Sequence, residues 1–216
     1  MRMEALLDEA IEACRSLHLQ GLLAAADGNV SVRLEEGRIA ITPRGVPKAS
    51  LQRQDFAVLA PDGAVLRGNP SSERSMHLAV YQAVPEAKAV VHAHPVTAIA
   101  WSLANPGAEE LPSDALPEVI LAAGRIPLVP MATPGTEEMG AALAPFLPAH
   151  RLMILARHGG LAWGGSVREA AGGIERLEQV AKLLLAAEAF GGAKPLAELD
   201  LAALRALREK LGPGLL

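Results

Sequence analysis

The chain has 216 residues, half of them hydrophobic, which is enough for one sizeable domain with a full core. Its net charge is −4 and it has no basic stripe, which argues against a nucleic-acid-binding protein. No apolar run reaches the roughly 18 residues that span a bilayer, and the acidic, amphipathic N-terminus does not resemble a signal peptide. Because Cys14 is the single cysteine, no internal disulfide can form, and we expect a cytoplasmic protein in which this thiol is buried on a helix.

The first half of the chain alternates between helical and strand periodicity. In chain order, the patterns predict a helix at 3–19, β-hairpins at 30–42 and 56–68, a helix at 71–84 and a strand at 87–94. Asp62 and Gly63 are expected in the turn of the second hairpin. Ser71 begins the second helix as a capping residue, and Pro95 ends the strand.

The second half of the chain mixes helices and strands in the same way. In chain order, we expect a helix at 96–104, strand-like runs at 119–124 and 126–131, a helix at 135–147, two strands joined by a glycine turn at 151–164, a long helix at 166–191 and a last helix before a Gly-Pro tail. No repeat or linker interrupts the chain. The sequence therefore predicts a single α/β domain over 1–216, with a central, largely antiparallel sheet flanked by helices.

Two histidines lie one residue apart in an otherwise apolar, β-branched segment, "AVVHAHPVTA". On a strand, His92 and His94 point to the same face. Two buried imidazoles without a partner are costly, whereas neutral imidazole is a preferred ligand of zinc. The alternative is a pair of partly solvated strand residues. If the two histidines bind a metal ion, a third ligand must come from another part of the chain.

His158 is the best candidate for that third ligand, because it closes an apolar strand and precedes two glycines that allow a close turn. Three neutral imidazoles leave zinc with its charge and an open fourth position, which is the pattern of a catalytic site. Such a site polarises a bound oxygen and stabilises an enolate. The remaining histidines, His18, His77 and His150, are expected to be structural or solvent-facing, with His77 as a local partner of Glu73.

Three loops share the chemistry of anion binding: small residues that expose backbone N–H groups, hydroxyls, and a helix N-terminus. Their candidate ligands are Gly28 and Asn29 in the first loop, Thr42, Arg44 and Gly45 in the second, and Ser71 and Ser72 in the third. Each loop alone is better explained as a turn or a cap, but together the three loops favour a phosphate site. Glu73 follows the serines, and is either a first-turn residue that favours the helix dipole or a proton acceptor and donor beside the metal.

The chain resembles a known family across about residues 5–190. The segments "GNVSVR", "ITPRGVP", "PSSE", "VVHAHP" and "HGGLAWG" stand in the order and spacing found in the class II, zinc-dependent aldolases of the fuculose-1-phosphate aldolase and ribulose-5-phosphate 4-epimerase type. Within that family the chain is most similar to the L-fuculose-1-phosphate aldolases.

This resemblance implies a homotetramer with active sites at subunit interfaces. It implies one zinc per subunit held by His92, His94 and His158, with Glu73 as general acid/base, and a sugar phosphate whose phosphate lies in the three loops. The implied reaction cleaves a ketose 1-phosphate such as L-fuculose 1-phosphate to dihydroxyacetone phosphate and L-lactaldehyde, through a zinc-stabilised enediolate.

Other reactions on the same site are open as alternatives: a 4-epimerase, a methylthioribulose-1-phosphate dehydratase, or a non-catalytic module like the adducin head. The chain also departs from the fuculose enzymes at two points. Arg44 stands where they have a small hydroxyl residue, and Tyr81 is the single tyrosine, whereas Glu118 lies in the segment where a tyrosine is expected.

Overall fold

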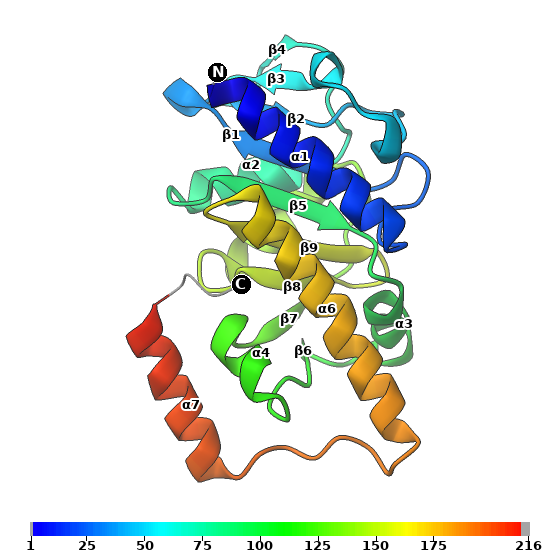
Figure 1. Cartoon of the computed structure of the whole chain (residues 1–216), viewed down its shortest axis with the longest axis vertical. Helices are drawn as coiled ribbons and strands as arrows, with labels where there is room; N and C mark the ends of the chain where they lie inside the picture. Colours follow the sequence, from blue (N-terminus) through cyan, green and yellow to red (C-terminus); the bar gives the residue numbers. More distant parts are fainter. Residues whose placement is uncertain (1, 213–216) are drawn as a thin grey trace.

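A nine-stranded sheet forms the centre of residues 2–212, which are the residues that this computed structural model describes (Figure 1). Its strands are β1 (Asn29–Arg33), β2 (Ile39–Ile41), β3 (Ala57–Leu59), β4 (Val65–Arg67), β5 (Ala89–Ala93), β6 (Glu110–Leu111), β7 (Ile126–Val129), β8 (Leu152–Leu155) and β9 (Gly159–Gly164). They are arranged in the order β4-β3-β2-β1-β5-β9-β8-β7-β6. The predicted Gly-Pro tail lies outside the described residues from position 213 onwards, and a single domain over 1–216 stays a prediction.

The sheet is largely antiparallel, as expected. Every neighbouring pair of strands is antiparallel except β7 and β8, which are parallel. The two predicted hairpins are present as β1–β2 and β3–β4. In the centre, Asn29 of β1 pairs with His92 of β5, and His92 pairs on its other side with Leu161 of β9. This register places Asn29, at the start of β1, beside His92, near the end of β5.

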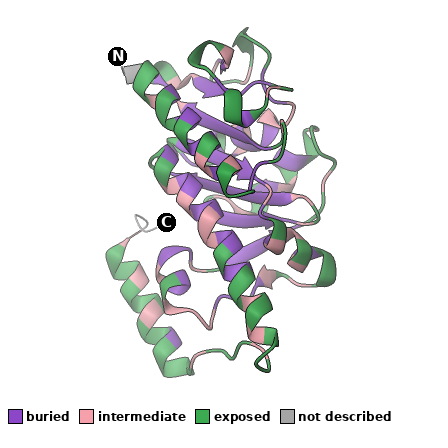
Figure 2. Cartoon of the chain, turned by 45° about the vertical axis from the view of Figure 1, so that its right-hand side comes forward, coloured by how far each residue is buried: buried purple, intermediate pink, exposed green. Residues whose placement is uncertain are grey.

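Helices cover both faces of the sheet. They are α1 (Arg2–Leu19), α2 (Arg74–Ala83), α3 (Val96–Ala104), α4 (Pro117–Ala122), α5 (Glu138–Leu143), α6 (Val167–Glu188) and α7 (Glu198–Leu211), with short 3-10 turns at Glu35–Gly37, Lys48–Ser50, Arg53–Asp55 and Ala144–Phe146. α1 and α6 cross one face, and α2 lies behind the sheet (Figure 1). Figure 2 shows the strands buried between these layers, while the outer sides of α1, α6 and α7 are exposed.

The two faces of the sheet build two separate apolar clusters. Val91 of β5 faces the cluster shared with α1 and α6, whereas Val90 faces the cluster shared with α2 and α5. This alternation follows from the two-residue period of a strand. It also assigns His92 to the α2 side of the sheet, beside the N-terminus of that helix. Cys14 is buried on α1, as the sequence predicts.

Three boundaries differ from the sequence prediction. The run at 119–124 is not a strand but most of α4, which begins with Pro117 at its first position; proline there presets the helical φ, and a short apolar run carries no period of its own. α2 begins at Arg74 rather than 71, with Glu73 at the N-cap and no side-chain cap. β5 ends at Ala93, so His94 lies just beyond the strand.

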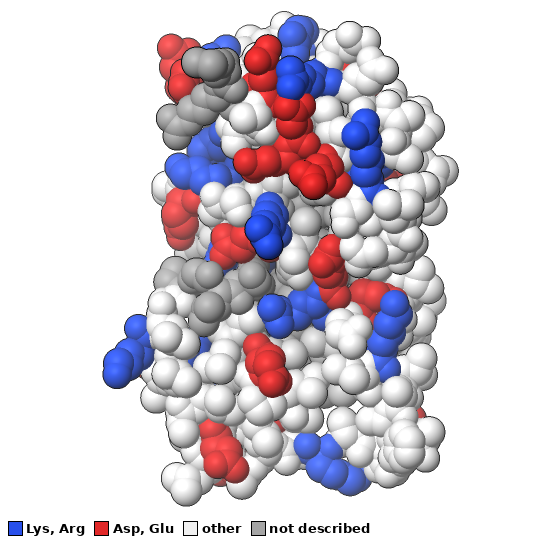
Figure 3. All heavy atoms as spheres, in the orientation of Figure 1, with Lys and Arg blue, Asp and Glu red and all other residues white. Residues whose placement is uncertain are grey.

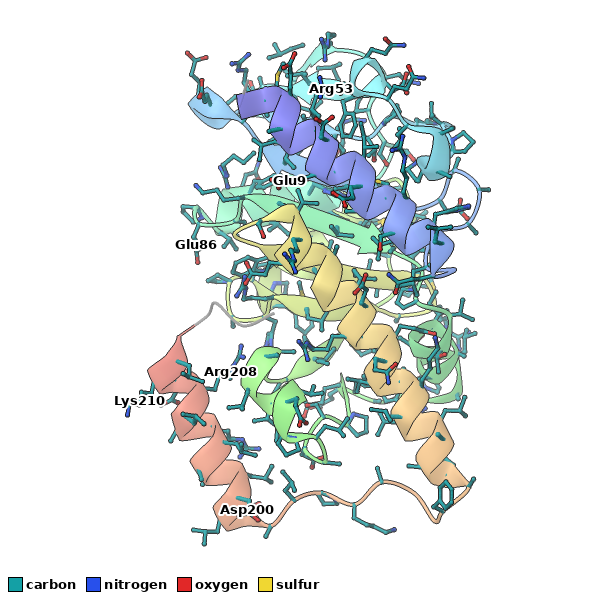
Figure 4. The ribbon with its side chains drawn as sticks, in the orientation of Figure 1. Glu9, Arg53, Glu86, Asp200, Arg208 and Lys210 are labelled. Atoms are coloured by element: carbon teal, nitrogen blue, oxygen red, sulfur yellow. The ribbon has the colours of Figure 1, made fainter. Side chains whose placement is uncertain are left out.

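The C-terminal helix α7 packs beside α4 rather than on the central sheet (Figure 1). The guanidinium of Arg208 donates hydrogen bonds to the carbonyl oxygens of Leu121 and Ala122 at 2.5 and 2.6 Å, at the end of α4. Figure 4 shows Arg208 reaching from α7 towards α4. The contact satisfies carbonyls that α4 leaves unpaired at its C-terminus.

The surface carries both signs of charge. On the face with α1 and α6, Figure 3 shows acidic and basic side chains interspersed. None of the helices within the described residues combines the length and the apolarity that a bilayer crossing needs.

Candidate active site

Three histidines meet at the end of the central strands. His92 is in β5, His94 follows that strand, and His158 lies in the turn between β8 and β9. The ring centroids of His92 and His94 are 5.0 Å apart, those of His92 and His158 are 4.7 Å apart, and those of His94 and His158 are 5.4 Å apart. Each ring offers a nitrogen within 4.8 Å of the other two, so the residues singled out in the sequence are brought together in a geometry that can hold a metal ion.

The turn that carries His158 is tightly determined. Arg157 has a left-handed backbone, with φ of 63°, and its N–H donates to the Ser102 hydroxyl of α3 at 3.0 Å. At Gly159, the next but one residue, the backbone passes close to the end of β5. A Cβ there would stand 2.5 Å from the carbonyl oxygen of Ala93 and 2.8 Å from the His92 ring. A glycine is therefore required at 159 to let the two strand ends meet.

His92 is a neutral ring whose tautomer leaves the Nε2 lone pair facing the other two histidines. Complete burial lowers the pKa of His92 to about 3, so the ring is neutral at neutral pH. Its Nδ1 lies 2.9 Å from the carbonyl oxygen of Gly160, which can only accept, so Nδ1 carries the proton. Nε2 therefore presents a lone pair to His94 Nε2 at 3.2 Å and to a Glu73 oxygen at 3.4 Å.

A lone pair that faces a carboxylate and a second imidazole nitrogen is an arrangement that a bound cation would stabilise. His158 adds a third ring nitrogen within 4.8 Å of those of His92 and His94. Its Nδ1 is buried and has no hydrogen-bond partner among the described residues. Neutral imidazoles are strong ligands for zinc and related ions. The donor set of His92, His94 and His158 thus fits a divalent metal, with Gly160 fixing the tautomer of His92 as an outer hydrogen-bond partner.

Glu73 lies directly beside the triad. One of its oxygens is 3.1 Å from His158 Nε2, and the other accepts a hydrogen bond from the Asn29 amide at 2.8 Å. Burial by itself raises the pKa of this carboxyl, but the hydrogen bond from His158, the positive charge that His92 and His158 carry when they are protonated, and the hydrogen bond from Asn29 lower it to about 2. The Glu73 side chain is therefore an ionised carboxylate beside the ring nitrogens of His158 and His92.

The three predicted anion loops converge on the N-terminal side of α2. Pro43 and Pro70 form an isolated bridge, and the Ser71 N–H donates to the carbonyl oxygen of Thr42 at 3.1 Å. Gly28 has a left-handed φ of 69°, and a Cβ there would stand 2.8 Å from the carbonyl oxygen of His92. The first loop is thus packed against the histidine strand, which explains why a glycine is needed there.

The seven candidate phosphate ligands differ in their exposure and in whether their side chains already make hydrogen bonds within the protein. The Thr42 hydroxyl is fully buried and accepts a hydrogen bond from the Val30 N–H at 3.1 Å. The Asn29 side chain is also buried and is used by Glu73. Ser71 accepts from the Glu73 N–H at 3.3 Å. Arg44 and Gly45 are exposed and Ser72 is half-buried, so these three remain accessible to a ligand.

Lys48 and His77 were not predicted as functional residues, yet both are buried beside the site. The Lys48 ammonium donates to the carbonyl oxygens of Ala26 and Val46 at 2.7 and 3.0 Å, which ties the first anion loop to the second. His77 is fully buried and does not touch Glu73 directly; Asn29 lies between them. The signal in the sequence was the i, i+4 spacing of His77 and Tyr81 on α2.

The other histidines have structural contacts. His18 lies at the end of α1, where its Nδ1 is 3.0 Å from the carbonyl oxygen of Leu23. His150 precedes β8, and its carbonyl oxygen accepts a hydrogen bond from the Trp163 indole at 2.9 Å. Neither contact involves the triad.

Comparison with known proteins places this chain and its fold in one family. The Class II Aldolase and Adducin N-terminal domain matches residues 8–185. The chain is 34% identical over 187 residues to 3-oxo-tetronate 4-phosphate decarboxylase of Escherichia coli K12, covering 84% of this chain and 86% of that protein. It is 35% identical over 188 residues to L-fuculose phosphate aldolase of the same strain, covering 86% and 85%.

A solved structure gives the same result. YgbL of Escherichia coli, described as an aldolase, epimerase or decarboxylase, superposes with a TM-score of 0.88 at 31% identity, covering 95% of this chain and 100% of that one. The chain therefore belongs to the class II aldolase and adducin family.

Proposed function

We propose that this protein is a divalent-metal-dependent lyase that breaks a carbon–carbon bond in a phosphorylated sugar derivative. The substrate that we assign first is a ketose 1-phosphate of the L-fuculose type, cleaved to dihydroxyacetone phosphate and L-lactaldehyde. The observation that carries this proposal is the ionised Glu73 carboxylate, held 3.1 Å from His158 and 3.4 Å from His92. A base fixed beside a metal-binding triad is the arrangement that proton transfer next to a carbonyl group requires.

The residues that would hold the metal, with zinc as our choice, are His92, His94 and His158. A bound divalent cation would supply Lewis-acid stabilisation of the negative charge that develops on the ketone and hydroxyl oxygens of the substrate. In the synthetic direction the ionised Glu73 carboxylate would take a proton from the carbon next to the ketone. In the cleavage direction the carboxylate would first be protonated by the proton that the substrate hydroxyl loses as it becomes the aldehyde, and would then pass that proton to the carbon released by bond cleavage. The Asn29 amide holds one carboxylate oxygen in place for that transfer.

The three loops would bind the substrate phosphate. We assign Gly28, Asn29, Thr42, Arg44, Gly45, Ser71 and Ser72 to this site. Arg44 is the exposed cation of the group, and its guanidinium can make paired hydrogen bonds to a phosphate. The N-terminus of α2 adds the positive end of its dipole.

A second candidate reaction is decarboxylation, because the chain is as similar to 3-oxo-tetronate 4-phosphate decarboxylases as to fuculose phosphate aldolases. Loss of the carboxyl group from a 3-oxo-tetronate 4-phosphate leaves the bonding electron pair on the carbon next to the ketone. Protonation of that carbon gives dihydroxyacetone phosphate, the same product as in the aldol cleavage. The two reactions therefore need the same proton transfer from Glu73 and differ in whether an aldehyde or carbon dioxide leaves.

Product analysis distinguishes these possibilities. The metal-loaded protein is incubated separately with L-fuculose 1-phosphate and with 3-oxo-tetronate 4-phosphate, and the products are identified by NMR. We expect dihydroxyacetone phosphate with L-lactaldehyde from the first. Carbon dioxide release from the second compound alone would replace the aldolase assignment by the decarboxylase. An isomer or a dehydrated ketone would indicate the epimerase or dehydratase alternative.

The role of Glu73 has its own test. Glu73→Gln should keep bound metal but lose exchange of the transferable proton of dihydroxyacetone phosphate with solvent. Glu9→Gln, on the exposed side of α1, is the matched control (Figure 4). If Glu73→Gln exchanges that proton at the rate of the unmodified protein, Glu73 is not the base. A protein that binds no divalent metal would instead fit the adducin-like, non-catalytic alternative.

We also propose that the protein works as a cytoplasmic homotetramer with active sites at subunit interfaces. The support is the family resemblance, together with the partly exposed position of His94 and the exposed Arg44 in the single chain. A second subunit would complete the open side of the site. Light scattering coupled to size-exclusion chromatography measures the oligomeric state directly.

A further inference from the structure

A continuous line of hydrogen bonds runs from Glu73 into the protein interior. The Asn29 amide donates to Glu73 at 2.8 Å, and Asn29 Oδ1 lies 2.5 Å from His77 Nε2. On the other side of the ring, His77 Nδ1 lies 2.7 Å from the Ser31 hydroxyl, which lies 2.9 Å from the Tyr81 hydroxyl. Asn29, Ser31, His77 and Tyr81 are all buried, with at most 5% of each residue exposed.

This line of hydrogen bonds forms because evenly spaced side chains of β1 face evenly spaced side chains of α2. Asn29 and Ser31 are two residues apart on β1, so they point to the same face of the sheet. His77 and Tyr81 are four residues apart on α2 and share one side of that helix. Arg33, the next residue on the same face of β1, donates to the carbonyl oxygen of Tyr81 at 2.9 Å and holds the end of α2 against the strand.

The direction of each hydrogen bond follows from the one before it. The Asn29 amide nitrogen can only donate and lies beside a Glu73 oxygen, so the Asn29 amide oxygen faces His77. That oxygen can only accept, so His77 Nε2 carries a proton. Complete burial lowers the pKa of His77 to about 4 and keeps the ring neutral, which leaves a lone pair on Nδ1.

The remaining two hydrogen bonds are then determined as well. His77 Nδ1 can only accept, so the Ser31 hydroxyl donates its proton to the ring. The Ser31 oxygen is left to accept the proton of the Tyr81 hydroxyl. All four hydrogen atoms therefore point in one direction, from Tyr81 towards Glu73, and each donor is polarised by the one behind it.

We propose that Asn29, His77, Ser31 and Tyr81 form a positioning relay, in which His77 as the Nε2–H tautomer locks the Asn29 amide and thereby holds the Glu73 carboxylate in one orientation against the triad. The inference rests on the proposed role of Glu73 in proton transfer. His77, Ser31 and Tyr81 touch neither the substrate nor the metal in this assignment, whereas Asn29 also belongs to the first anion loop. They act on the reaction through Glu73.

The relay predicts a specific kinetic pattern. His77→Leu removes the donor to Asn29, which frees its amide to rotate and releases one oxygen of Glu73. We expect kcat to fall by about 10²-fold, the order expected for a small misplacement of a catalytic group, while KM changes little and metal content stays at one per subunit. His77→Gln can donate to Asn29 and accept from Ser31, so it should restore most of kcat. Tyr81→Phe removes only the farthest donor and should have a smaller effect.

The matched control is His150→Leu, because His150 is a partly buried histidine outside the relay. It should leave kcat unchanged. If His77→Leu lowers metal content in proportion to kcat, or if His77→Gln is as defective as His77→Leu, the role of His77 is structural and the relay is wrong as a positioning device.

A spectroscopic test on the unmodified protein does not depend on activity or on the folding of a variant. Nitrogen NMR of protein labelled in its histidine rings, assigned with His77→Gln, should show His77 with a protonated Nε2 and an unprotonated Nδ1. A ring protonated on Nδ1, or on both nitrogens, at neutral pH would overturn the relay. If the NMR result holds but neither phosphorylated substrate is turned over, the relay stands and the proposed reaction fails, so the two failures are distinguishable.

Discussion

Glu178 of α6 accepts hydrogen bonds from both the backbone N–H and the hydroxyl of Thr97, at 2.9 and 2.7 Å. Thr97 lies in the first turn of α3, three residues after His94. The Glu178 side chain, which belongs to α6 and is buried, thus caps the N-terminus of a different helix, α3. The contact ties the segment after the histidine strand to the longest helix of the fold.

Glu178→Ala should therefore destabilise the protein. The change leaves donors at the start of α3 without a partner, which costs on the order of 1–3 kcal/mol in the free energy of unfolding. Urea denaturation measures this loss. Gln179→Ala is the control, because Gln179 is exposed on the same helix, and it should change stability by less than about 0.5 kcal/mol. Equal effects of the two changes would contradict the capping role.

Gly159→Ala should weaken metal binding. A Cβ at 159 would stand 2.8 Å from the His92 ring and 3.0 Å from the His94 ring, so both rings must move. We expect metal affinity to fall roughly 10–100-fold, the range found when the surroundings of metal ligands are disturbed. Titration with zinc against a competing chelator measures it.

Gly172→Ala is the matched control for that change. Gly172 lies within α6, and a Cβ there meets no atom within 4 Å. Metal affinity should be unchanged, and stability should rise by about 0.5–1 kcal/mol because alanine favours the helix more than glycine does. Wild-type affinity in Gly159→Ala would show that the triad tolerates the added methyl group.

His77 should make the metal-free protein less stable in acid. Burial lowers its pKa in the folded protein from 6.5 to about 4, so between these values the unfolded chain binds a proton that the folded protein does not. Stability is therefore lost as the pH falls from about 6.5 towards 4, by up to about 1.4 kcal/mol per pH unit for one such group.

His77→Gln isolates this contribution, because glutamine does not titrate. Over the same pH range, denaturation of the variant in the presence of a chelator should show a shallower dependence of the free energy of unfolding on pH. His92 and His94, whose pKa values are also lowered by burial, remain in both proteins and cancel in the comparison. Parallel curves would mean that His77 is already protonated in the folded state.

Arg208→Ala should release α7 from the rest of the protein. The guanidinium makes two hydrogen bonds to the end of α4, and its loss leaves those carbonyl oxygens without that partner. We expect faster amide hydrogen exchange and faster proteolysis within α7. Lys210→Ala is the control, since Lys210 points away from α4 (Figure 4) and is exposed. Unchanged exchange in Arg208→Ala would show that apolar packing alone holds the helix.

Most elements of the fold could be predicted from the sequence because their periods are unambiguous. The helix at 3–19, both hairpins and the long helix after Ser166 each repeat their pattern over enough residues to exclude the alternative. The run at 119–124 could not be predicted, because six apolar residues fit a buried strand as well as a helix. Pro117 and packing against α7 decide for the helix.

The candidate site divides in the same way. By itself, the sequence predicted that three histidines and Glu73 share one site, and the structure brings the four side chains together. The sequence also determined the family, through the order and spacing of five short segments. Which side-chain atoms are free was decided only by the tertiary structure. β1 pairs with β5, and His77 of α2 is buried against β1, where the Asn29 amide is hydrogen-bonded to Glu73 on one side and to His77 on the other. Asn29 and His77 are 48 positions apart in the chain, so no local sequence pattern predicts their hydrogen bond.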